Sequence, residues 1–171
     1  MVDPRAERPD MRDYGVDTPA WAALPWAWAA ERLIANRNFW VVTVSADGRP
    51  HAMPVWGVWE EAEHRFAFSC SPRARKARNL AANPRAVVMV DDTVECVSVE
   101  GRAVLVGDRA RRAQWAERYV GKYRPFSPGL STEFVTQHLI FEFGPERAFA
   151  VIEREEEFAT RATRWVFEPG A

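Results

Sequence analysis

Four basic residues crowd the start of a predicted helix near the middle of the chain, in the segment Ser69-Cys70-Ser71-Pro72-Arg73-Ala74-Arg75-Lys76-Ala77-Arg78-Asn79-Leu80. Ser71 followed by Pro72 is typical of a helix N-cap and first helical residue, so free backbone N–H groups and the positive dipole end are expected there. Cations destabilise a helix start by roughly 0.3 to 1 kcal/mol each. A bound phosphate would convert this repulsion into charge-assisted hydrogen bonds, so the segment predicts an anion site.

The alternative interpretation is a solvated charged face whose arginines pair with acids elsewhere, because most charge runs are of that kind. Two neighbouring features favour the anion site. The hydroxyls of Ser69 and Ser71 can donate to a phosphate. The nearby strand contains Pro54, which cannot donate to a ladder, so this strand is expected to be an edge, a bulge or a place where backbone faces a ligand.

Composition restricts the classes of function. The 171 residues include 23 Lys and Arg against 24 Asp and Glu, so overall charge gives no reason to expect nucleic acid or an anionic membrane as partner. The length fits one domain, and we expect a flexible or clasping N-terminal arm over residues 1–17 and a single domain over 18–171. No secretory leader or membrane span is recognised, which predicts a cytoplasmic protein.

The expected elements that position this segment are mostly short strands. Helices are expected at Pro25 to Asn36, preceded by a helical opening at Thr18-Pro19, and from Asp108 to about Tyr123, with a short turn beginning near Ser131. Seven strands are expected at Asn38 to Ser45, Arg49 to Trp59, Arg65 to Cys70, Ala86 to Asp91, Val94 to Val106, Gln137 to Phe143 and Glu146 to Ile152. Gly144-Pro145 would join the last two, and the run Glu153 to Glu157 is expected to be a solvated face. This order favours an antiparallel barrel.

No catalytic residue or metal site is predicted. His51, His64 and His138 are widely separated, and Cys70 and Cys96 have no metal-ligand spacing. Among the three histidines, His51 is the candidate for a functional role. It lies on the strand that contains Pro54 and could contact a cofactor, donate a proton or ligate haem.

Three motifs together resemble the pyridoxamine 5'-phosphate oxidase-like superfamily: Asp47-Gly48-Arg49-Pro50-His51, then Ser71 to Leu80, then Asn83-Pro84-Arg85. The tail Thr160-Arg161-Ala162-Thr163-Arg164-Trp165 is similar to the closing segment of its flavin/deazaflavin oxidoreductase branch. The resemblance implies a mainly β fold with flanking helices, an FMN-binding split β-barrel of about six to seven antiparallel strands. It also implies a homodimer with cofactor clefts at the subunit interface.

The resemblance also implies which residues bind the cofactor. Arg75 and Lys76 would hold its phosphate, with Ser69, Ser71 and Asn79 in support. The strand residues His51, Met53, Pro54, Val55 and Trp56 would lie along the ring. Arg164 and Trp165 would line the ring or substrate side, either from the same chain or from the partner subunit.

The function implied is an oxidoreductase in which reduced coenzyme F420 or FMN transfers hydride to a conjugated small-molecule acceptor. The Thr-Arg-Trp ending favours F420 over FMN, and the lack of a longer substrate-phosphate segment argues against vitamin B6 oxidation. The alternative is a non-catalytic protein that binds or senses a flavin, a deazaflavin or haem.

Overall fold

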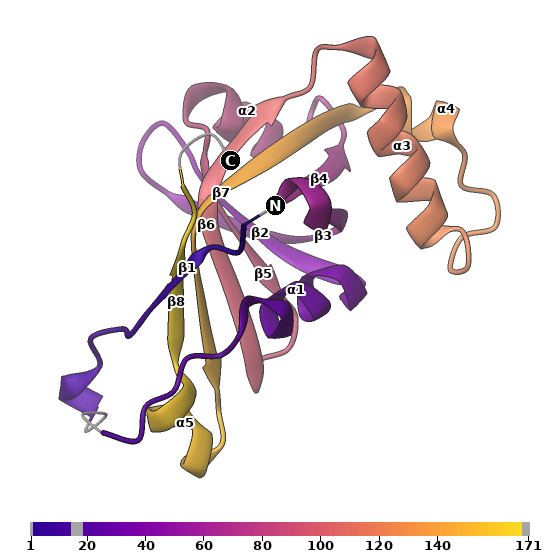
Figure 1. Ribbon diagram of the computed structural model, residues 1–171. Coiled ribbons are helices and arrows are strands. Elements are labelled where there is room, and N and C mark those ends of the chain that lie inside the picture. The colour runs from indigo at the N-terminus through magenta and orange to yellow at the C-terminus, as the bar shows by residue number, and fades with distance from the viewer. Residues whose placement is uncertain (1, 15–18, 169–171) are drawn as a thin grey trace.

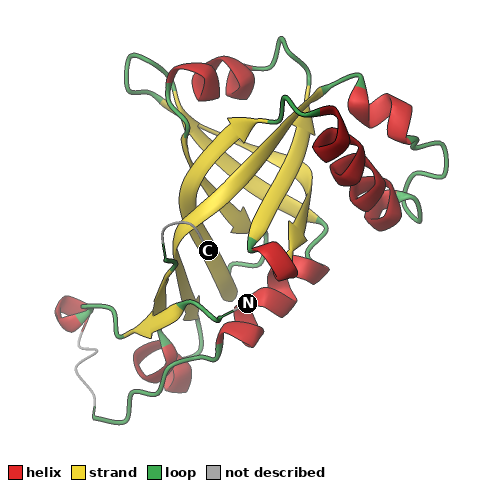
Figure 2. Ribbon diagram, turned by 45° about the horizontal axis from the view of Figure 1, so that its top comes forward, coloured by secondary structure: helices red, strands yellow, loops and turns green. Residues whose placement is uncertain are grey.

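Six antiparallel strands close into a barrel in the computed structural model, which describes residues 2–14 and 19–168. The strands are β2 (Asn38–Val44), β3 (Pro50–Glu60), β4 (Arg65–Cys70), β5 (Arg85–Val90), β6 (Glu95–Leu105) and β7 (Leu139–Ile152). They are ordered β7-β4-β3-β2-β5-β6, and pairing of β6 with β7 closes the ring (Figure 2). The mainly β split-barrel fold predicted from the sequence is therefore confirmed.

Two further strands extend the sheet beyond the barrel. β8 (Thr163–Val166) pairs with the second half of β7, and β1 (Arg5–Glu7) pairs with β8. The N-terminal segment thus covers the outer edge of the C-terminal strand, and the two lie side by side in Figure 1. A short 3-10 turn at Arg12–Tyr14 follows β1, and another at Glu61–Glu63 follows β3.

Helices cover the ends and one side of the barrel. α2 (Arg75–Ala82) and α1 (Trp26–Ala35) lie toward opposite ends, while α3 (Arg109–Tyr123) and α4 (Thr132–Thr136) form an excursion on one side (Figure 1). α3 begins as expected, because the Asp108 side chain accepts a hydrogen bond from the Arg111 N–H at 2.7 Å. The last helix, α5 (Glu155–Arg161), precedes β8.

The hydrophobic core has two parts. The larger fills the barrel and the space under α1, where Phe39, Phe66 and Trp165 have no exposed surface. The smaller lies between the barrel and the α3–α4 excursion and is built around Trp115 and Tyr123. Both parts contain several aromatic residues, which accounts for the high aromatic content of the chain.

The prediction that Gly144-Pro145 joins two separate strands is wrong, because β7 is one continuous strand of 14 residues. The pairing of β6 with β7 shifts register between Glu100 and Gly101, and Pro145 lies opposite Gly101. A Cβ on Gly101 would lie 2.1 Å from the carbonyl oxygen of Gly144, so only glycine allows this close approach. The bulge accommodates the proline inside a long bent strand.

Two further expectations need correction. Thr18 lies outside the described residues, and Pro19 and Ala20 form a turn with no helix over 21–25, so the expected helical opening is absent from the part that is described. The charged run at Glu153 to Glu157 is mostly exposed as expected, but its second half begins α5. Three glutamates in the first turn of α5 stabilise it through the helix dipole.

No helix within residues 2–14 and 19–168 is both long and apolar enough to cross a membrane. The cytoplasmic location inferred from the sequence stays a prediction.

Candidate functional site

The basic segment begins with a turn rather than with the helix itself. Ser71 Oγ accepts a hydrogen bond from Arg73 N–H at 3.2 Å, and the Ala74 N–H donates to the Ser71 carbonyl at 3.0 Å. The helix starts at Arg75, three residues later than the Ser-Pro pattern predicts, with Ala74 as its N-cap. Arg75 and Lys76 therefore occupy the first turn of α2, where backbone N–H groups lack helical acceptors. The shift moves the dipole end onto the two residues predicted to hold phosphate.

The first half of β3 presents an open backbone edge. Residues 50–56 pair with β2 on one side, whereas pairing with β4 begins only at Gly57. Within the described chain, the other edge of this stretch has no strand partner. Pro54 lies in this open stretch, opposite Trp40 of β2. The strand that contains Pro54 was expected to be an edge, a bulge or a place where backbone faces a ligand, and the structure shows an edge.

His51 lies on this stretch of β3 and is close to the start of α2. The pKa of its imidazole is lowered by burial first, and then by the charges of Arg75 and Lys76. Its Nδ1 is buried and has no hydrogen-bond partner among the described residues. An orphaned ring nitrogen beside two cations is the kind of polar group that a ligand satisfies.

Asn79 links α2 to the barrel wall. Its side chain is 5% exposed, and Nδ2 donates to Thr43 Oγ1 of β2 at 3.0 Å. Thr43 is in turn the register partner of His51. Asn79 therefore fixes α2 against the strand next to His51.

The remaining strand residues of the candidate site differ in exposure. Met53 is 44% exposed and Pro54 is exposed, whereas Val55 and Trp56 are half-buried. Trp56 stacks in parallel on Tyr123 of α3, with ring centroids 4.5 Å apart and planes 2° apart. One face of the indole is thus already occupied within the chain, and Met53 to Val55 form the more accessible part of the strand.

Tyr123 and Lys122 of α3 hold the point where the partner of β3 changes from β2 to β4. The fully buried Tyr123 hydroxyl accepts a hydrogen bond from Gly57 N–H at 2.8 Å and lies 2.7 Å from the Arg37 carbonyl oxygen. Lys122 Nζ donates to the Gly57 carbonyl at 3.1 Å and sits 4.8 Å from the ring centroid of Phe39. Burial lowers the pKa of Lys122 to about 8. Sequence reasoning assigned these residues no role, and only the fold shows that they anchor the candidate ring strand.

Ser69 ends β4 next to the basic segment. It is half-buried and pairs with Ile140 of β7. Burial raises the pKa of the neighbouring Cys70 thiol, and the charge of Lys76 opposes this rise. The fold therefore brings His51, Ser69, Ser71, Arg75, Lys76 and Asn79 to one end of the barrel.

Arg164 and Trp165 lie on β8, beyond β7, and are not brought to α2 within one chain. Trp165 is completely buried and packs edge-on against Trp26, with ring centroids 5.5 Å apart. Arg164 is half-exposed and lines a hollow of about 140 Å³ together with Glu100 and Arg147. Trp165 therefore supports β8 from inside the core, and only Arg164 has a side chain near the surface.

A larger groove of about 790 Å³ lies beside this hollow, outside the β6–β7 bulge. Charged residues of both signs line it, including Arg102, Arg147, Glu100 and Glu146. None of its lining residues belongs to α2 or to the open edge of β3. Its mixed charge gives no preference for an anion, so we place the candidate site at α2.

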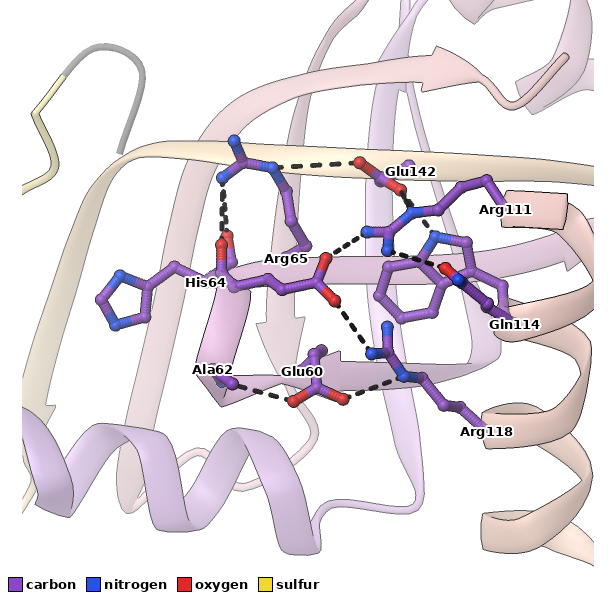
Figure 3. Close-up of polar contacts among 10 residues, drawn as sticks. Glu60, Ala62, His64, Arg65, Arg111, Gln114, Arg118 and Glu142 are labelled. Carbon is purple, nitrogen blue, oxygen red and sulfur yellow. Dashed lines mark hydrogen bonds and ion pairs between the residues drawn. The ribbon is translucent and has the colours of Figure 1, made fainter. Parts of the chain in front are cut away.

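An ion-pair network fixes α3 to the barrel. Arg111 pairs with Glu63 and, at 2.7 Å, with Glu142. Arg118 pairs with Glu63 at 2.8 Å and with Glu60 at 3.0 Å (Figure 3). The pKa of Glu63 is lowered to about 2, chiefly by the hydrogen bond from Arg111. These paired carboxylates anchor the excursion and are poorly suited to act as acids or bases.

The model of the family described as pyridoxamine 5'-phosphate oxidase matches residues 27–149. No curated protein sequence matches the chain.

Similar solved structures include a conserved hypothetical protein from Mycobacterium tuberculosis, with 16% identity over 90% of this chain and 96% of that one and a TM-score of 0.64. The haem storage protein HutZ from Vibrio cholerae is 21% identical over 71% of this chain and 91% of its own, with a TM-score of 0.59. An F420 reductase is 19% identical over 73% of this chain and 98% of its own, with a TM-score of 0.57. At these identities the likeness concerns the fold.

Proposed function

Because the chain belongs to the pyridoxamine 5'-phosphate oxidase family, we propose that it is an oxidoreductase that binds a phosphate-bearing flavin or deazaflavin. The cofactor phosphate lies against the start of α2, and its ring lies along the open edge of β3. When bound, the reduced ring supplies hydride to a conjugated small-molecule acceptor.

One observation carries the proposal. Two cations and the free N–H groups of a helix start lie next to a strand that lacks a partner along residues 50–56. A phosphate satisfies the cations and the free N–H groups of the helix start. The polar rim of a flavin-type ring satisfies the unpaired N–H and C=O groups along the open edge of β3. The residues present therefore fit a cofactor that carries both groups.

The roles of individual residues follow from their exposure. Arg75 is exposed and Lys76 half-exposed, so both can reach a phosphate, and the exposed Ser71 lies in the turn that precedes them. Ser69 and Asn79 support the same end of the barrel. Met53, Pro54 and Val55 contact the ring, while Trp56 sets the position of the strand through its stack on Tyr123.

The proposal includes a homodimer. The outer face of β3, β2 and β5 is largely apolar and partly exposed, with Trp40 at 42% exposure flanked by Pro54 and Met89. Val42 continues this face between Ala52 and Val87. Pairing two such faces would bury the apolar patch next to the ring strand, so cofactor clefts would form at the subunit interface. Arg164 of the partner subunit would then line the ring or substrate side.

Coenzyme F420 is preferred over FMN, because the segment Thr163-Arg164-Trp165 resembles that of deazaflavin-using relatives and because an F420 reductase has a similar fold. Purified protein should be titrated with both cofactors by fluorescence. Micromolar binding of at least one is the expected result, and failure of both to bind would refute the proposal. Turnover of the reduced cofactor with a panel of quinones and activated alkenes then tests catalysis.

A non-catalytic protein that binds or senses a flavin, deazaflavin or haem is the second candidate. It is supported by the His51 ring, whose Nδ1 has no partner among the described residues, and by the likeness to a haem storage protein. The haem version predicts a Soret band that is lost in His51→Ala. Detectable turnover with any acceptor would argue against the non-catalytic candidate.

A further inference from the structure

His51 lies where several features of the free protein oppose its protonation. Its ring is half-buried on β3, and Arg75 and Lys76 approach it from α2. Thr43, its register partner on β2, is uncharged. Among the described residues no carboxylate forms an ion pair with His51. These surroundings therefore disfavour the protonated imidazole, and its Nδ1 has no hydrogen-bond partner among the described residues.

An anion at the start of α2 reverses this balance. Its negative charge offsets the two cations that oppose protonation and directly favours an imidazolium. Arg75 and Lys76 act on the His51 ring from the first turn of α2. Asn79 keeps the helix in this place through its bond to Thr43, so the coupling depends on fixed structure and not on a mobile loop.

We propose that an anion held by Arg75 and Lys76 binds together with one proton, which is taken up by His51. His51 then acts as a third ligand group for the anion, in a pH-dependent manner. The proton comes from the buffer, and no bond of the anion is broken. The inference rests on the proposed function in one respect, namely that the natural anion is the phosphate of the cofactor.

The coupling predicts the direction and size of a pH effect. If anion binding raises the pKa of His51 by about one unit, affinity falls about tenfold as pH rises through the titration of the ring. A phosphomonoester such as that of FMN itself loses a proton near pH 6, which acts in the opposite direction. The informative quantity is therefore the difference in pH dependence between the wild type and His51→Gln, which cannot titrate.

The test is an NMR pH titration of the histidine Cε1–H resonances, with His51→Gln identifying the His51 signal and His138→Gln as the matched control. His138 contacts the Phe134 carbonyl of α4 through Nδ1 at 2.8 Å and is not part of the α2 site. Spectra are recorded for the free protein, with saturating FMN, with riboflavin and with inorganic phosphate. We expect the pKa of His51 to rise by about one unit with FMN or phosphate and not with riboflavin.

The outcomes separate this inference from the proposed function. FMN that binds without changing the pKa of His51, or riboflavin that raises it equally, overturns the proton coupling and leaves the cofactor proposal intact. If neither FMN nor F420 binds, the cofactor proposal fails. The titration with inorganic phosphate then tests the proton coupling by itself. A raised pKa of His51 supports the coupling, and an unchanged pKa of His51 overturns it.

Discussion

Replacing the two first-turn cations of α2 should weaken cofactor binding without weakening the fold. In Arg75→Ala and Lys76→Ala, each lost charge-assisted bond to phosphate costs about 1.5 to 3 kcal/mol. That range corresponds to about a 10- to 150-fold loss of affinity for each side chain. The two positions are adjacent and share one ligand, so the double variant should lose about 100-fold or more rather than the full product.

The stability of the folded protein should rise or stay unchanged in these variants. Neither side chain forms a hydrogen bond or ion pair with another described residue, and each opposes the dipole of α2 at its positive end. Alanine also has a higher helix propensity. The thermal midpoint of the double variant, measured without cofactor, should therefore equal or exceed that of the wild type.

The assay is a fluorescence titration with FMN and F420, paired with thermal denaturation. Arg73→Ala is the matched control, because Arg73 is an exposed arginine in the turn that precedes the helix. Unchanged affinity in the double variant would refute the phosphate assignment. A lowered midpoint together with lowered affinity would show that the residues act through folding, which contradicts the reasoning from the helix dipole.

Three further predictions follow from the contacts around the site. Tyr123→Phe should lower the free energy of unfolding by about 1 to 3 kcal/mol, because the buried Gly57 N–H loses its acceptor, whereas Tyr119→Phe should cost little; urea denaturation compares them. The pKa of Glu63 is about 2 when folded and 4.5 when unfolded, so its contribution is present above about pH 4.5 and is lost as pH falls toward 2. The stability gap between the wild type and Glu63→Gln should therefore shrink from pH 7 to pH 3.5, and an unchanged gap would contradict this. Trp40→Glu should give monomers in analytical ultracentrifugation while the wild type is dimeric; a variant that stays dimeric would place the interface elsewhere.

The sequence predicted most elements because their periodicity and caps are local. The strand Arg65 to Cys70 and the helix that begins after Asp108 were predicted correctly for this reason. The turn predicted at Gly144-Pro145 is wrong because the bulge that accommodates these residues depends on Gly101 of the partner strand, which is far away in sequence. The helix start predicted at Ser71-Pro72 is wrong because the same residues suit a β-turn as well as a helix start. In the structure the Ser71 hydroxyl accepts a hydrogen bond within that turn.

The structure adds detail to the site that the sequence indicated, and the anion proposed there stays a prediction. The crowding of cations near Arg75 and Lys76 indicated an anion, since it breaks a local preference. The burial of Trp165 was not predictable, because a tryptophan in a short C-terminal strand serves either a core or a cleft. The open edge beside Pro54 was one of three alternatives, and the choice among them required knowing where β4 begins to pair.

The central claim is that the start of α2 binds the phosphate of the cofactor. The most direct test measures the affinity of the wild-type protein for each cofactor and for its phosphate-free form, riboflavin for FMN and the deazaflavin alcohol for F420. For the cofactor that binds, the phosphorylated form should be about 100-fold tighter or more, in keeping with two charge-assisted contacts. Equal affinities for the two forms would contradict the claim.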